Sequence, residues 1–451
     1  MRTAPWSAYL FGPRHASYNQ AASAFTPTTA TAVTPAWTFT AAAPTVTGQP
    51  GAGFSASPTV SGGVVYIGAN TGVFSAVDEA TGAELWHRSL GYTTAKTCGY
   101  GRGITSTATV APDPSRGGRL TVYVAGGDGY LYALKASDGT TVWRKKVVGI
   151  GTTQNTGYNW SSPTVSGGTV VIGMSSQCDK PLIRGGIKSF SQSTGTLLHT
   201  YFTVPSGSVG GSVWTSVASD NTNAWATVGN GDSGDSFQIV RLDAGTLAKQ
   251  EGWTVPGTAG TDLDWGSSPT LFSAVLNGTT VPMVGGCNKN GVYYALRSTD
   301  LAAGPVWSRR LGVNGDLAAG KGSCLAAGIW DFTNKHLYVG SNTTTIHSVS
   351  TPGSVRALDP ATGHVLWAQP LSGGPVMGSP ALSGGGVIAA GTYNTATPTA
   401  NRVYLLNAST GQIVNTITES SAVFSQPVFA DDMLFIAAGN GVLTAYRATG
   451  S

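Results

Sequence analysis

Short stretches in which hydrophobic and polar residues alternate run along the whole chain, separated by turns rich in Gly, Asn, Asp and Ser. Residues 63–68 and 120–125 are two such stretches, and Asp128-Gly129 and Asn440-Gly441 follow others. A period of two residues is typical of β-strands with one buried face, and Asp-Gly or Asn-Gly pairs favour tight reversals of the chain. The pattern therefore predicts an all-β protein built from antiparallel hairpins.

A longer repeat is superimposed on this alternation. The pattern Ala-x-Asp-x-x-Thr-Gly-x-x-x-Trp of residues 76–86 recurs in close form at 133–143 and 357–367. Small-residue turns that precede an extended run recur at intervals of roughly 50 residues and divide the chain into eight units. These turns begin at Ser57, Ser106, Ser162, Ser216, Ser268, Ala326, Ser379 and Gln426. Four antiparallel strands per unit, repeated radially, predict an eight-bladed β-propeller of four-stranded blades.

The two ends of the chain are expected to share one blade. The last unit stops near Ala445-Tyr446 without a strand that ends in Gly-x-x-x-Trp, and residues 33–40, which include Trp37, resemble the missing strand. We therefore predict a single propeller over residues 33–451, closed by the N-terminal strand near 33–40. Residues 1–32 are expected to be an extension that packs on it.

Composition agrees with a turn-rich β-protein. The 451 residues include 63 glycines, only 10% are charged, and 41% are hydrophobic, which argues against disorder. The net charge of +4 comes from Lys and Arg residues that stand singly or in pairs, so a solvated surface is favoured over nucleic-acid binding. No apolar run has the length of a membrane span. A closed ring leaves few unpaired strand edges, so we expect a monomer.

The four cysteines are Cys98, Cys178, Cys287 and Cys324. They permit two disulfides, but their spacing gives neither the pairing nor the oxidation state. No Cys-x-x-Cys-His haem attachment site occurs, so any electron carrier would be separate. The first residues lack the apolar core of a signal peptide, while low charge and abundant Thr, Ser and Gly are typical of exported bacterial proteins. We predict a secreted or periplasmic protein whose signal peptide is not present in this chain.

The blade signature resembles the tryptophan-docking motif of the pyrroloquinoline quinone (PQQ) dependent alcohol dehydrogenases, which form eight-bladed propellers. The stretches at 175–179 and 288–295 are most similar to the shorter, polyvinyl-alcohol dehydrogenase type. Non-enzymatic relatives, including the propeller of the outer-membrane assembly machinery, carry the same signature, so the signature implies a fold and no function. In the family each docking tryptophan packs between neighbouring blades, which implies structural roles for Trp86, Trp143, Trp253, Trp307 and Trp367.

Residues that depart from the blade pattern resemble the cofactor and metal site of the dehydrogenases. Arg102 resembles the arginine that contacts PQQ, although a single Cys98 stands where the family has a vicinal pair, and a solvated turn arginine would look the same. Trp214, in Gly-Gly-Ser-Val-Trp, resembles the indole beneath the quinone. Asp179 and Asn230 resemble the ligands of calcium or a lanthanide; Asp179 is offset by one residue and shorter than the family glutamate. Plain turn roles are the alternative for both.

A second group resembles the catalytic residues of the family. Asp262 or Asp264 would be the base, and Lys289, which precedes Asn290-Gly291, would contact the quinone carbonyls. Two acids at positions i and i+2 share a face when the segment is extended. The chemistry needs these groups because a hard cation with oxygen ligands acts as a Lewis acid and a carboxylate can take the alcohol proton. Lys289 and Arg102 would stabilise negative oxygens.

Two functions remain open. The resemblance implies an exported oxidoreductase that oxidises a secondary or polymeric alcohol with PQQ and a calcium-type metal and passes electrons to a separate acceptor such as a cytochrome. The alternative is a non-catalytic propeller that serves as a binding or scaffold module, which the single Cys98 and the short Asp179 favour.

Overall fold

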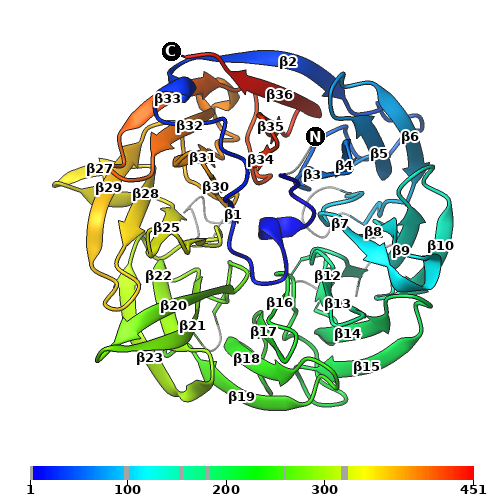
Figure 1. Cartoon of the computed structure of the whole chain (residues 1–451). Coiled ribbons are helices and arrows are strands. Elements are labelled where there is room, and N and C mark those ends of the chain that lie inside the picture. Colours follow the sequence, from blue (N-terminus) through cyan, green and yellow to red (C-terminus); the bar gives the residue numbers. More distant parts are fainter. Residues whose placement is uncertain are drawn as a thin grey trace. The chain divides into compact units, whose positions relative to one another are not determined.

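The chain folds almost entirely into β-strands (Figure 1). The computed structural model describes residues 4–95, 101–151, 156–178, 182–258, 261–315 and 324–450. Over these ranges the strands form eight main sheets, each with four antiparallel strands, an eight-bladed β-propeller, which confirms the predicted fold class. The helical elements there are short 3-10 turns: η1 (Tyr9–Phe11), η2 (Thr29–Thr31), η3 (Pro114–Arg116) and η5 (Pro398–Ala400).

The chain divides into two compact units, each with four of the sheets. Unit 1 comprises Met1–Trp6, Leu10–Thr38 and Asp262–Ser451, and unit 2 comprises Ser7–Tyr9 and Phe39–Thr261.

The sheets of unit 2 follow one another in chain order. Their strands are β3 (Thr59–Ser61), β4 (Val64–Gly68), β5 (Val73–Asp78) and β6 (Glu84–Ser89); β7 (Thr109–Asp113), β8 (Arg119–Ala125), β9 (Tyr130–Lys135) and β10 (Thr141–Lys146); β11 (Gly157–Tyr158), β12 (Thr164–Ser166), β13 (Thr169–Ser176), β14 (Gly186–Ser191) and β15 (Leu197–Phe202); β16 (Ala218–Ser219), β17 (Asn223–Thr227), β18 (Gln238–Asp243) and β19 (Lys249–Thr254). The predicted strands at 63–68 and 120–125 correspond to β4 and β8.

The sheets of unit 1 include both ends of the chain. Their strands are β20 (Thr270–Leu276), β21 (Thr279–Cys287), β22 (Val292–Arg297) and β23 (Asp300–Arg310); β24 (Ile329–Asp331), β25 (His336–Ser341), β28 (Gly353–Leu358) and β29 (Val365–Leu371); β1 (Tyr18–Asn19), β30 (Ala381–Ser383), β31 (Val387–Gly391), β32 (Arg402–Asn407) and β33 (Ile413–Thr418); β2 (Val33–Thr40), β34 (Val428–Ala430), β35 (Met433–Ala437) and β36 (Val442–Ala448). A small hairpin of β26 (Thr344–Ile346) and β27 (Val349–Thr351) stands apart. Strand β2 pairs with β36, so residues from opposite ends of the chain share a sheet.

The repeated tryptophans hold successive sheets of each unit together. In unit 2 the Trp86 indole Nε1 donates to the Ala136 carbonyl (3.0 Å), and a side chain at Gly139 would approach the Trp86 ring to 2.5 Å. In unit 1 Trp307 does the same with Pro360 (2.9 Å) and Gly363. Glycine is needed at these positions because the ring lies against the backbone and φ is positive, +68° at Gly139 and +65° at Gly363. Trp143 and Trp367 repeat the contact with Gly195 and Gly411.

The small-residue turns at the start of each blade make a second link, through hydroxyl groups. In unit 2 the Ser57 amide donates to Thr107 Oγ1 (2.9 Å), the Thr107 amide to Ser162 Oγ (3.0 Å), and the Ser162 amide to Ser216 Oγ (2.9 Å). Buried amides need acceptors, and Ser or Thr supplies one in the least space. The recurrence of Ser and Thr at these positions therefore has a structural cause.

The N-terminal segment contacts the first strands of successive sheets within unit 1. The carbonyls of Arg14, Ala16 and Ser17 accept hydrogen bonds from the amides of Leu271, Trp330 and Leu382. His15 lies fully within this packing, and its Nδ1 is 2.8 Å from the Pro269 carbonyl oxygen. In Figure 1 the segment runs beside β30, with which β1 pairs in parallel.

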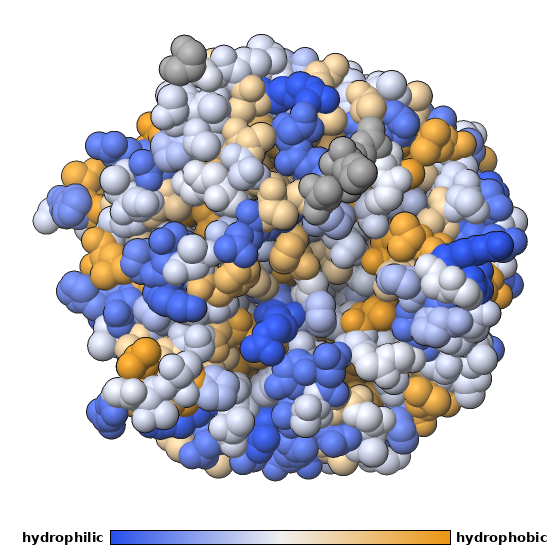
Figure 2. Space-filling model, in the orientation of Figure 1, coloured by the Kyte–Doolittle hydropathy of each residue, from blue (hydrophilic) through white to orange (hydrophobic). Residues whose placement is uncertain are grey.

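On the face drawn in Figure 2, hydrophilic and hydrophobic residues are interspersed in small groups. Among the described residues no helix is long and apolar enough to cross a membrane.

Candidate functional site

Two of the predicted site segments in unit 2 lie side by side. The Gly211 amide donates to the Asn230 carbonyl (2.7 Å), and the Gly229 amide donates to the Ser212 carbonyl (2.7 Å). Gly210 has a φ of +100°, and a side chain there would approach the Gly231 Cα to 2.7 Å, so only glycine permits this approach. The backbone that leads to Trp214 therefore runs beside Asn230.

The side-chain oxygen of Asn230 is the most informative atom of this pair. Asn230 Oδ1 is buried and accepts no hydrogen bond from any residue that the structure describes. A buried acceptor without a donor costs about 1–3 kcal/mol and calls for an explanation such as a bound ion. Asn230 has no positive φ, so the alternative of a left-handed turn residue does not account for it. An amide oxygen is a ligand that calcium accepts, and Asn230 therefore fits the predicted metal site.

The end of β13 adjoins the same backbone. The Ser176 amide donates to Ser212 Oγ (3.1 Å), and the Val213 amide, next to the half-buried Trp214, donates to the Met174 carbonyl (3.0 Å). Cys178, two residues beyond Ser176, is disulfide-bonded. Asp179, the other predicted metal ligand, lies outside the described residues.

Arg102 contacts an aromatic residue that the sequence analysis did not single out. Its backbone pairs with Thr93 through two hydrogen bonds (2.7 and 3.0 Å), and its Cζ lies 4.5 Å from the centroid of the Trp160 ring. The Trp160 Nε1 donates to the Gln177 carbonyl (3.0 Å), directly beyond β13. Trp160 thus links Arg102 to the segment beside Ser212. Like Trp214, it falls outside the docking spacing, and that was the signal available in the sequence.

In unit 1 the two predicted catalytic acids, Asp262 and Asp264, converge on Lys289, which was predicted to contact the cofactor. The Lys289 Nζ lies 2.8 Å from Asp262 Oδ1 and 2.6 Å from Asp264 Oδ1. The backbone arranges this, because Trp265 and Asn288 form a β-bridge and the Lys289 amide donates to the Asp264 carbonyl (3.0 Å). Both acids therefore contact the same lysine, although residues 261–264 do not form a strand.

The members of this cluster differ in their access to solvent. Side-chain exposure is 34% for Asp262, 11% for Lys289 and 2% for Asp264. Burial lowers the pKa of Lys289, but the carboxylates of Asp264 and Asp262 outweigh it and raise that pKa above its usual value. Lys289 is therefore charged at neutral pH. Asp262 is the carboxylate that a substrate can reach, and Asp264 serves as the buried partner of the lysine.

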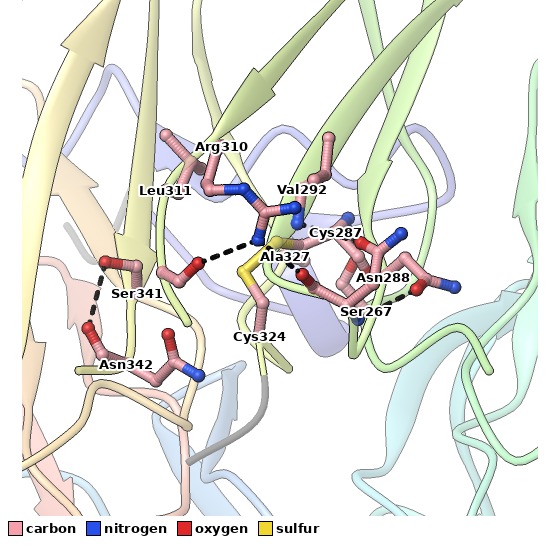
Figure 3. Close-up of a disulfide and its surroundings, with 12 residues drawn as sticks. Ser267, Cys287, Asn288, Val292, Arg310, Leu311, Cys324, Ala327, Ser341 and Asn342 are labelled. Carbon is pink, nitrogen blue, oxygen red and sulfur yellow. Dashed lines mark hydrogen bonds between the residues drawn. A yellow bond between two sulfur atoms is a disulfide. The ribbon is translucent and has the colours of Figure 1, made fainter. Parts of the chain in front are cut away.

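A disulfide anchors the end of β21, two residues before Lys289 (Figure 3). Cys287, at the end of β21, is bonded to Cys324, and both residues are fully buried. The Cys287 amide donates to Ser267 Oγ (2.6 Å), which ties β21 to the segment of Asp262 and Asp264. Figure 3 shows Ser267 and Asn288 on one side of the disulfide, and Ser341 and Asn342 on the other. The cysteine spacing alone did not give this pairing.

Known proteins resemble the chain in both sequence and fold. Residues 6–240 match the family model described as glucose/ethanol/alcohol dehydrogenase, beta-propeller domain. Residues 351–451 match that of outer membrane protein assembly factor BamB.

Over the part of the chain that the structure describes, no group of three or more His, Cys, Asp or Glu side chains is placed to hold a metal ion.

Two relatives cover parts of the chain. Quinohemoprotein alcohol dehydrogenase ADH IIB of Pseudomonas putida is 26% identical over 296 residues, 55% of this chain and 40% of that protein. BamB of Yersinia pestis is 30% identical over 124 residues, 27% of this chain and 31% of that protein. The chain therefore spans less than half the length of either relative.

Solved structures share the fold. The quinohemoprotein alcohol dehydrogenase of Comamonas testosteroni superimposes with a TM-score of 0.75 at 18% identity, over 100% of this chain and 81% of that one. A europium-containing methanol dehydrogenase superimposes with a TM-score of 0.77 at 13% identity, over 98% of each chain. At these identities the likeness concerns the fold alone.

Proposed function

The chain belongs to the family of PQQ-dependent alcohol dehydrogenase-like β-propellers, and from this membership we propose that it is an exported quinoprotein oxidoreductase. Its substrate is a secondary or polymeric alcohol, and its electrons pass to a separate acceptor such as a cytochrome. The cofactors are PQQ and a calcium-type cation. The polyvinyl-alcohol type remains the prediction for the subfamily.

The observation that carries the proposal concerns Asn230, which lies beside the Gly210–Ser212 backbone. Its Oδ1 is buried and receives no hydrogen bond from the described residues. An oxygen without a hydrogen-bond donor suits a hard cation, which prefers oxygen ligands. Asn230 would hold the cation, with Asp179 as the second protein ligand. Trp214 would present its ring face to the planar cofactor, and the Arg102 guanidinium would bind its negative oxygens.

For the charged cluster of unit 1, taken by itself, the family resemblance supports a role in proton transfer. Asp262, with 34% of its side chain exposed, would accept the hydroxyl proton of the alcohol at a carboxylate oxygen. Lys289 stays protonated beside the two acids and offers positive charge to developing negative oxygens. Asp264 keeps Lys289 in place. When bound, PQQ serves as the hydride acceptor and the cation as the Lewis acid.

Export has support of its own in the cysteines. The buried Cys287–Cys324 disulfide is of the kind that forms in oxidising compartments outside the cytosol.

Reconstitution tests the proposal. The purified chain is titrated with PQQ, with and without calcium or lanthanum, while the quinone absorbance is followed, and dye reduction is then measured with primary, secondary and polymeric alcohols. We expect cation-dependent PQQ binding and alcohol-dependent dye reduction. Asn230→Ala should lose the cation dependence.

A matched control is available at an equivalent turn. Asn440 also precedes a glycine, but its Oδ1 accepts a hydrogen bond from the Val442 amide (3.1 Å). Asn440→Ala should therefore bind PQQ as the wild type does. A chain that binds no PQQ with either cation would instead favour the scaffold alternative, which the match of residues 351–451 to BamB supports.

A further inference from the structure

Two aromatic residues that are close in sequence, Tyr158 and Trp160, contact the segment that contains Arg102. The Tyr158 hydroxyl donates to the carbonyl of Gly103 (2.6 Å), and the Trp160 ring lies against the guanidinium of Arg102. The two rings pack edge to face, with centroids 5.1 Å apart. One residue therefore holds the backbone at Arg102 and the other holds its side chain.

Trp160 differs from the tryptophans that dock blades. The docking residue Trp86 covers a glycine and donates its indole N–H to a carbonyl of the following sheet. Trp160 presents its ring to a cation, and its indole N–H donates to Gln177, next to β13. Gln177 is held in turn, because its Nε2 donates to the Ala95 carbonyl (2.9 Å). Two contacts therefore fix the orientation of the Trp160 ring, one with Arg102 at its face and one with Gln177 at its indole N–H.

The contact with Trp160 restricts the conformations that the Arg102 side chain can adopt. Arginine loses considerable rotamer freedom when it is ordered, and binding is weakened if that freedom is lost only when the ligand arrives. An indole face attracts a guanidinium and holds its plane parallel or tilted to the ring. Arg102 is therefore ordered before any ligand binds.

We propose that Trp160 is a positioning residue that holds Arg102 ready for the anionic oxygens of PQQ. The inference rests on the proposed function, since it assigns Trp160 a role in the same site. It extends the binding apparatus to a residue that acts through Arg102.

The test is the affinity for PQQ in a double-mutant cycle. The dissociation constant is measured by titration at saturating calcium for the wild-type chain, Trp160→Leu, Arg102→Leu and the double variant. We expect Trp160→Leu to weaken PQQ binding about 3- to 30-fold when Arg102 is present, the range given by a cation–π contact, and to have no effect in the Arg102→Leu background. Trp160→Phe, which keeps a ring, should recover part of the affinity.

Thermal unfolding without cofactor identifies variants that fail to fold, and Trp160→Phe keeps the test valid if Trp160→Leu is one of them. Trp86→Phe serves as the matched tryptophan control in the same unit and should leave the PQQ affinity unchanged. An unchanged affinity in Trp160→Leu, or an equal loss in both Arg102 backgrounds, overturns the role of Trp160 while the proposed function stands. Absence of PQQ binding by the wild-type chain overturns the proposed function itself, and the role of Trp160 with it.

Discussion

The candidate residues of the two units differ in how their polar groups are satisfied. In unit 1 the Lys289 ammonium group lies 2.6 to 2.8 Å from carboxylate oxygens of Asp262 and Asp264. In unit 2 the Arg102 guanidinium rests on an aromatic ring, and Asn230 Oδ1 receives no hydrogen bond from the described residues. A buried charge without a partner costs several kcal/mol, whereas a buried neutral oxygen without one costs about 1–3 kcal/mol. The charged cluster must therefore be complete before any ligand binds, and the neutral oxygen can be left open for one.

This difference separates stability from binding. Substitutions in the charged cluster should lower the stability of the chain whether or not a ligand is present. Substitutions at the open oxygen should change ligand binding and leave the free chain as stable as before. The predictions below test this separation, beginning with the largest effect.

Lys289→Met should have the largest effect. Removal of the lysine leaves Asp264 buried at 2% exposure without its cation, and breaking a buried pair in this way costs about 3–5 kcal/mol. Chemical denaturation of the cofactor-free chain measures the change. Arg88→Met is the matched control, because Arg88 is a half-buried cation of β6 whose hydrogen bonds within the described residues go to backbone carbonyls and not to a buried acid. Equal stability of Lys289→Met and the wild type would mean that the cluster does not hold unit 1 together.

Acid should lower the free energy of unfolding of unit 1, because His15 is buried there in its neutral form. Burial lowers the pKa of His15 from 6.5 to about 4, so the folded chain keeps this histidine neutral while the unfolded chain takes up a proton near pH 6.5. The free energy of unfolding therefore falls as the pH drops from 6.5 to about 4, by about 3 kcal/mol in total, and the contribution is constant below that range. Denaturation at a series of pH values measures the slope.

His15→Gln should remove this part of the slope. His364→Gln is the control, because His364 is exposed. If the two variants have the same pH dependence, His15 does not make the N-terminal segment sensitive to acid.

Substitution of the two carboxylates of unit 1 should have different effects, one mainly on stability and the other mainly on turnover. Asp264→Asn replaces a buried acid and should cost about 1–3 kcal/mol of stability, because Lys289 keeps only Asp262. Asp262→Asn changes a side chain that is 34% exposed and should cost less than about 1 kcal/mol. If Asp262 is the base, Asp262→Asn instead lowers the turnover of the reconstituted enzyme by about 10²- to 10⁴-fold. A larger loss of turnover in Asp264→Asn at equal stability would reverse the assignment.

The sequence predicted those parts of the molecule that depend on local patterns. The eight blades follow from a repeat, and Trp86 and Trp307 occupy their docking positions because each contact joins equivalent residues of successive repeats. The convergence of Asp262, Asp264 and Lys289 followed from the resemblance to a family. The contact between Arg102 and Trp160 could not be predicted, because it depends on where the chain between two blades lies. The Cys287–Cys324 pairing was equally beyond the spacing of the cysteines.

Asn230→Ala should have the smallest effect on stability and is the sharpest test of the comparison. The substitution removes a buried oxygen that receives no hydrogen bond from the described residues, which is favourable, and also removes packing of the side chain, which is unfavourable. The two effects largely cancel, so the free energy of unfolding of the cofactor-free chain should change by less than about 0.5 kcal/mol, or rise slightly. In the wild type, added calcium should raise the unfolding midpoint, because a cation that binds only the folded state stabilises it. Asn230→Ala should lose that rise, and Asn440→Ala should keep it. If Asn230→Ala destabilises the cofactor-free chain by several kcal/mol, Asn230 is a structural residue and unit 2 resembles unit 1 in needing no ligand to complete it.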